Sequence, residues 1–162
     1  MALIAEEIVE EWLNRKGFFT IRGIKIGSHE IDLLAIKPKL EGIECRHLEV
    51  TVSANPVSYF TEKTAKKKNS IELERCVDAW VAKKFNNTKK EQLKSKLANG
   101  NWSRELVVGE VVFAEELELV REKSFTVHEF KTVIKELRSK DNIVGKAVGS
   151  NLVDLFLFSE TE

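Results

Sequence analysis

The 162-residue sequence has few cysteines and no net charge, and each of these shortages excludes a class of protein. Its two cysteines, Cys45 and Cys76, lie far apart and form no C-x-x-C pair, so neither a disulfide framework nor a zinc site is expected. Twenty-six basic residues balance 26 acidic ones, which argues against a protein that binds nucleic acid by bulk charge alone.

Long apolar runs are also missing. No segment approaches the about 20 apolar residues that span a bilayer, and the N-terminal sequence MALIAEEIVEEW turns acidic at once, unlike a secretory signal peptide. We therefore expect a cytoplasmic protein that does not bind membranes. The length, with 43% hydrophobic and 32% charged residues, predicts a single domain over residues 1–162 with one core.

The charges that are present are unevenly distributed. Between Lys63 and Arg104 basic residues far outnumber acidic ones, which predicts that one face or one end of the fold is basic. Solvated helix surfaces explain most runs of this kind, and this alternative stays open.

Apolar periodicity predicts helices and strands along the chain. The short connections between the early strands favour antiparallel neighbours. The C-terminal run NLVDLFLF fits either a strand or a helix. In chain order the predicted elements are a helix at about 2–16, strands within 18–27, 29–37 and 43–53, helices at about 61–85 and 89–98, a strand within 105–113, and a helix for which Thr126 is the N-cap.

Strand alternation brings two carboxylates into the same region. Asp32 lies opposite the apolar side of HEIDLLAIK, and in HLEVTVS the polar face carries His47, Glu49 and Thr51. Two neighbouring carboxylates repel each other unless a cation lies between them, and hard cations such as Mg²⁺ take oxygen ligands while keeping several waters. Such a metal would promote cleavage of phosphodiesters. The alternative is a structural pair that caps strands or binds lysines.

The segments AEEIVEEWLNRKGF, GSHEID and HLEVTVS follow one another within residues 5–60. This order closely resembles the PD-(D/E)xK nucleases of the restriction-endonuclease-like superfamily, in particular archaeal Holliday junction resolvases and their bacterial relatives. The resemblance implies an α/β fold (an α+β sandwich) with a central mixed sheet flanked by helices, a DNA substrate, Mg²⁺ or Mn²⁺ as cofactor, and often a homodimer. It also implies that Asp32 and Glu49 are metal ligands and that Glu6 completes the acidic cluster.

The sequence departs from the family pattern E-x-K at Thr51, where the family has a lysine. In the family this lysine orients the attacking water and offsets the charge that develops in the transition state, whereas a hydroxyl supplies no charge. Extending the apolar stripe of the helix predicted at 61–85 towards its start places Lys63 and Lys66 on the side that faces the sheet. Either lysine is therefore a candidate for the missing cation.

Two functions follow from these residues. The first is a metal-dependent nuclease-like protein that acts on DNA phosphodiesters through Glu6, Asp32 and Glu49. The alternative is a catalytically inactive nuclease fold that binds nucleic acid or a protein partner. His47 shares the face of Glu49, and it either contributes to the metal site or is a satisfied strand residue. A plain interaction protein that dimerises through LVDLFLF is a third possibility.

Overall fold

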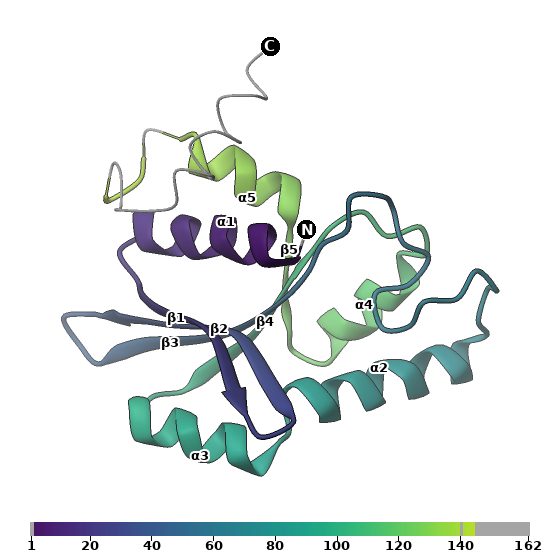
Figure 1. The fold of residues 1–162 in the computed structure, drawn as a ribbon, viewed down its shortest axis with the longest axis horizontal. Helices are drawn as coiled ribbons and strands as arrows, with labels where there is room; N and C mark the ends of the chain where they lie inside the picture. The colour runs from purple at the N-terminus through teal and green to yellow at the C-terminus, as the bar shows by residue number, and fades with distance from the viewer. Residues whose placement is uncertain (1, 140, 145–162) are drawn as a thin grey trace.

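A computed structural model describes residues 2–139 and 141–144. Five strands form one mixed sheet in the order β1-β2-β3-β4-β5, with helices on both faces (Figure 1). The predicted α+β class with a central mixed sheet is therefore confirmed, while the C-terminal run at 151–158 lies outside the described residues. The elements are α1 (Ala2–Arg15), β1 (Phe19–Ile26), β2 (His29–Pro38), β3 (Ile43–Thr51), α2 (Ser70–Lys84), α3 (Thr88–Leu97), β4 (Trp102–Val108), α4 (Glu115–Glu122), β5 (Thr126–Glu129) and α5 (Phe130–Leu137).

The sheet has an antiparallel half and a parallel half. β1, β2 and β3 form an antiparallel meander, as their short connections predict. β4 runs parallel to β3, and β5 runs parallel to β4. Parallel neighbours need long crossovers, which α2 and α3 provide between β3 and β4, and α4 between β4 and β5.

Alternation along β3 and β4 divides the core into two layers. Leu48, Val50 and Val107 face α1 and α5, whereas Leu106 and Val108 face α2 and α4 (Figure 1). Both faces of β4 are thus covered, which explains why this strand is an almost continuous apolar run. No helix in the described part of the chain is long and apolar enough to cross a bilayer. Both cysteines are free thiols, as expected.

The helix predicted from Thr61 begins only at Ser70. Asn69 is its N-cap: the Asn69 side chain accepts the Glu72 N–H at 2.9 Å, and the Glu72 carboxylate accepts the Asn69 N–H at 3.1 Å. This capping box satisfies backbone donors that would otherwise be unpaired at a helix start, so it favours a boundary at this position.

The chain before this cap is held by a distant residue. The buried Glu116 of α4 accepts the backbone N–H of Phe60 at 2.7 Å and that of Thr61 at 3.2 Å. These donors point at a side chain 55 or 56 residues away, and they leave the segment before Ser70 outside the helix.

One prediction in the C-terminal half is wrong and another is shifted. The strand predicted within 105–113 forms but spans Trp102–Val108, and Thr126 does not cap a helix. Thr126 instead begins β5, where it is paired with Glu105 of β4, and the helix starts four residues later at Phe130. Sheet pairing overrides the local capping pattern at this point. The short helix α4 was not among the predicted elements.

Candidate active site

The candidate site lies where β2 and β3 separate. Their ladder ends at the pair Leu33 and Leu48. Beyond it, Asp32 Oδ2 accepts the backbone N–H of Val50 at 2.8 Å, so the carboxylate takes the place of a backbone partner. Glu49 is the residue of β3 just before that N–H. The end of the ladder thus brings together the two residues predicted as metal ligands.

Both carboxylates are buried in this position. Asp32 is 9% exposed and Glu49 only 1%. Burial raises the pKa of Asp32 to about 6, with a further contribution from the neighbouring Glu49, and burial also raises the pKa of Glu49. Together the two residues carry more negative charge than their surroundings stabilise, so the pair favours a proton or a cation.

Glu6 approaches the pair from α1. Partial burial and then the charge of Asp32 raise the pKa of Glu6 to about 7, and Glu49 contributes in the same direction. The charges of Asp32 and Glu49 thus reach Glu6, and its role in a metal site stays a prediction. No three His, Cys, Asp or Glu side chains within residues 2–139 and 141–144 are arranged to hold a metal ion.

A lysine that sequence reasoning missed lies between the two buried carboxylates. Lys84, the last residue of α2, has its Nζ 2.6 Å from Glu49 Oε2 and 3.9 Å from Asp32 Oδ1. Burial acts to lower the pKa of Lys84, but the two carboxylates outweigh it and hold this pKa above its usual value. Lys84 lies on the same face of α2 as the buried residues Leu73 and Val77. Following this apolar face towards the end of the helix would therefore have predicted that Lys84 faces the sheet.

A second lysine contacts the other carboxylate oxygen of Glu49. Lys90, in the first turn of α3, is 1% exposed and its Nζ lies 3.6 Å from Glu49 Oε1. The same Nζ donates to the backbone carbonyl of Lys84 at 2.8 Å. Burial lowers the pKa of Lys90, and Glu49 opposes this effect. Lys90 thereby joins the end of α2 to the buried glutamate, a favourable place for a cation beside a helix C-terminus.

His47 completes the surroundings of Glu49. It is fully buried, its Nε2 lies 3.3 Å from Glu49 Oε1, and its ring packs on Phe85 at 4.4 Å between centroids. Burial, together with Lys94 and Lys90, lowers the pKa of His47 to about 3. His47 is therefore neutral at physiological pH and supports Glu49 as a polar neighbour rather than as a charge.

The two lysines predicted to supply the cation lie elsewhere. Lys63 and Lys66 are exposed and precede α2, so the helical stripe that would direct them at the sheet does not form. Among the ion pairs of the described residues, none joins either lysine to Asp32 or Glu49. Thr51 is the half-buried last residue of β3, and its backbone carbonyl accepts the N–H of Gly109. A catalytic role for these three residues stays a prediction.

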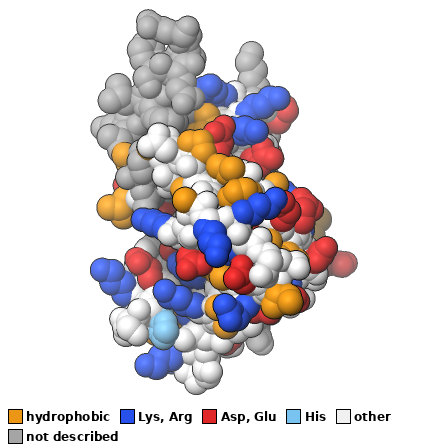
Figure 2. Space-filling view, turned by 90° about the vertical axis from the view of Figure 1, so that its right-hand side faces the viewer, with side chains coloured by type: hydrophobic (Ala, Val, Ile, Leu, Met, Phe, Trp, Pro, Cys, Tyr) orange, Lys and Arg blue, Asp and Glu red, His pale blue; other side chains and the backbone are white. Residues whose placement is uncertain are grey.

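Basic side chains flank the site on neighbouring elements. Lys83 and Lys89 are exposed on either side of the turn between α2 and α3, and the β1–β2 hairpin tip at Gly27 lies close to the ammonium of Lys89. On the face seen in Figure 2, basic and acidic side chains are interspersed, with basic ones most frequent at the lower left. Binding of a polyanion would thus depend on a few lysines around the site.

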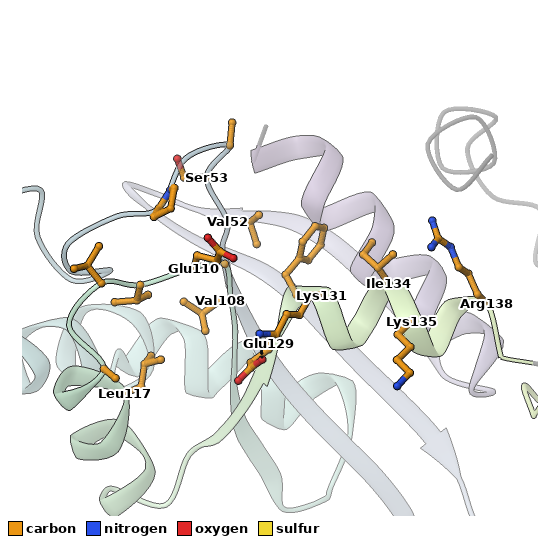
Figure 3. A pocket seen from close by; sticks show the side chains of 17 residues that line it. Val52, Ser53, Val108, Glu110, Leu117, Glu129, Lys131, Ile134, Lys135 and Arg138 are labelled. Atoms are coloured by element: carbon orange, nitrogen blue, oxygen red, sulfur yellow. Dashed lines mark ion pairs between the residues drawn. The ribbon is translucent and has the colours of Figure 1, made fainter. Parts of the chain in front are cut away.

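A large hollow of the described surface lies away from this cluster. It has a volume of about 960 Å³ and lies beyond the C-terminal ends of β3 and β4, between α4 and α5 (Figure 3). Val52, Val108 and Ile134 form part of its apolar lining, and Lys131 pairs with Glu129 at its edge. None of the candidate carboxylates lines it.

Comparisons with known proteins do not assign the site. No family model, no curated protein and no solved structure matches the chain. Asp32, Glu49 and Lys84 are the residues of the described chain that indicate a function.

Proposed function

We propose that the chain is a metal-dependent, nuclease-like phosphodiesterase that acts on DNA, with Asp32 and Glu49 holding Mg²⁺ or Mn²⁺. The observation that carries this proposal is the position of the Lys84 ammonium between the two buried carboxylates. The ammonium lies 2.6 Å from Glu49 Oε2 and 3.9 Å from Asp32 Oδ1, so the acidic pair already has one cation beside it. Two carboxylates suit Mg²⁺, which usually binds through one or two protein carboxylates and keeps several waters.

Each residue of the cluster has a role in this proposal. The bound metal would polarise the phosphodiester and lower the pKa of the attacking water. Lys84 supplies the positive charge that Thr51 lacks and contacts the phosphate oxygen on which negative charge develops. Glu6, the carboxylate of α1 whose pKa responds to Asp32 and Glu49, is the candidate acceptor for a proton from water. Lys90 and His47 hold the other oxygen of Glu49.

One observation favours the alternative function, a catalytically inactive module that binds nucleic acid. Lys84 and Lys90 already pair with Glu49, so the chain's own cations take the place beside this carboxylate that a metal would have. In that case the exposed lysines beside the site bind DNA phosphates, and the affinity falls steeply with salt because each phosphate contact releases counterions.

Cleavage assays on branched, single-stranded and duplex DNA with Mg²⁺ or Mn²⁺ test the proposal. We expect cleavage by the wild-type chain and none by Asp32→Asn or Glu49→Gln. Lys84→Met should reduce the rate by about 10²-fold to 10³-fold, as expected for the loss of one preorganised charged contact. Lys83→Met, which removes the neighbouring exposed charge, is the matched control: it should retain the cleavage rate at saturating DNA and change only the affinity for DNA.

The same assay separates the remaining alternatives. Strong losses in Lys63→Met or Lys66→Met, with little loss in Lys84→Met, would transfer the cationic role to one of those lysines. Salt-dependent DNA binding without cleavage under any metal condition would favour the inactive module.

A further inference from the structure

We propose that Lys84 and the metal exchange places on Glu49: metal binding displaces the Lys84 ammonium, which is thereby freed to contact the phosphate of the substrate. This inference rests on the proposed function and adds an order of events to it. In the absence of metal, Lys84 is held by the carboxylates. In the presence of metal, it is available for chemistry.

The distances favour an exchange. Lys84 Nζ lies 2.6 Å from Glu49 Oε2 and 3.9 Å from Asp32 Oδ1, and the two carboxylates also contact each other through a hydrogen bond. Mg²⁺ binds oxygens at about 2.0 to 2.1 Å, so an ion that bridged the two carboxylates would lie close to the ammonium. Two cations at such short range in a buried gap repel each other strongly. The ammonium therefore leaves when the metal enters.

The structure also identifies which lysine moves. Lys90 is 1% exposed and its Nζ is hydrogen-bonded to the carbonyl of Lys84, so it remains at Glu49 Oε1. The Lys84 side chain is 29% exposed and extends from the last turn of α2, where it can rotate towards solvent. Glu49 thus keeps its partners at Oε1 and releases Oε2 to the metal.

Mn²⁺ affinity tests the exchange without any measurement of catalysis. Isothermal titration calorimetry compares the wild-type chain with Lys84→Met, Lys83→Met and Asp32→Asn at one pH and one ionic strength. We expect Lys84→Met to bind Mn²⁺ about tenfold more tightly than the wild type, because no cation then competes for Glu49. Lys83→Met should stay close to the wild type, and Asp32→Asn should lose binding.

A second readout uses the wild-type chain and does not depend on the folding of the variant. The ¹³Cε–¹Hε NMR signal of Lys84, assigned by its absence in Lys84→Met or by sequential assignment, should move on addition of Mg²⁺ towards the position of exposed lysines. The signal of Lys90 should not move in that direction. A Lys84 signal that is unaffected by saturating Mg²⁺ would overturn the exchange.

The outcomes distinguish the two proposals. If Lys84→Met binds Mn²⁺ no more tightly than Lys83→Met while Asp32→Asn abolishes binding, the exchange is wrong and the metal site remains. If no chain binds Mn²⁺, Lys84→Met included, the metal site fails and the exchange fails with it.

Discussion

Two buried glutamates on neighbouring strands have opposite surroundings. Glu105 of β4 is 3% exposed and is met by Ser103 Oγ at 2.6 Å, His128 Nε2 at 2.7 Å and Arg46 Nε at 3.6 Å. Burial acts to raise the pKa of Glu105, but the hydrogen bonds from His128 and Ser103 outweigh it and keep this pKa below its usual value. Glu49 of β3 is as deeply buried, yet burial keeps its pKa raised.

The difference lies in the neighbouring acids. Glu105 is surrounded by donors, whereas Glu49 shares Lys84 with Asp32 and is close enough to Glu6 to raise its pKa. A fully satisfied buried carboxylate stabilises a fold, while a crowded acidic cluster is under electrostatic strain that a proton or a metal relieves. The comparison therefore separates a structural glutamate from a candidate functional one.

The largest expected effect is the loss of Lys90. Lys90→Met leaves Glu49 without the cation at Oε1 and removes the hydrogen bond to the end of α2. Because removing one partner of a buried ion pair is strongly destabilising, we expect the free energy of unfolding to fall by about 3 to 5 kcal/mol in urea denaturation. Lys89→Met, at the neighbouring exposed position, should change it little. Equal effects of the two variants would show that Lys90 does not support Glu49.

The second prediction concerns the structural member of the comparison. Glu105→Gln should lower the free energy of unfolding at pH 7 by about 1.5 to 3 kcal/mol, because it removes a charged acceptor from a satisfied network. Since the folded-state pKa of Glu105 is lowered, its contribution is present above the usual glutamate pKa and is lost as the pH falls through the folded value. Urea denaturation of the wild type and the variant should show a difference in the free energy of unfolding at pH 7 that becomes smaller at pH 3. A variant as stable as the wild type at pH 7 would contradict the structural role of Glu105.

Asp32→Asn should act in the opposite direction. With a folded-state pKa of about 6 and a usual value near 3.8, Asp32 favours folding at low pH and loses this contribution as the pH rises through 6. The asparagine can still accept the Val50 N–H, so at pH 8 in EDTA we expect stabilisation by about 1 to 2 kcal/mol. Thermal and urea unfolding at pH 4 should show little difference. If Asp32→Asn instead destabilised the protein at pH 8 as much as Glu105→Gln does, the acidic cluster around Glu49 would be as structural as the surroundings of Glu105.

The smallest effect is expected for Glu6→Gln. Glu6 has a folded-state pKa of about 7, so, like Asp32, it favours folding at low pH and loses this contribution as the pH rises. The loss extends to higher pH than for Asp32 because the folded-state pKa is higher. Because Glu6 is only partly buried and solvent screens its charge, stabilisation at pH 8 should stay below about 1 kcal/mol. A pH series of melting temperatures for Glu6→Gln and Glu7→Gln, its neighbour on α1, checks both the sign and the window.

Local patterns were sufficient for the first part of the fold. The helix before Gly17 and the three strands of the meander follow from periodicity, and alternation correctly separates Val50 from Glu49 and Thr51. The same reasoning failed at Thr61 and Thr126. At both positions the decisive partners lie far away in the sequence: Glu116 holds Thr61, and β4 pairs with Thr126. Local propensity carries no information about such contacts.

Strand alternation in the sequence was enough to predict that two carboxylates lie near each other on adjacent strands, with Thr51 and no lysine on the same face of β3. The identity of the cation beside them depends on the tertiary fold. Periodicity places a residue on a face of a helix, but it does not say how far along the sheet that helix lies. The cap at Asn69 and the turn before Lys90 set the position of α2, and that position brings Lys84 to a glutamate 35 residues earlier in the chain.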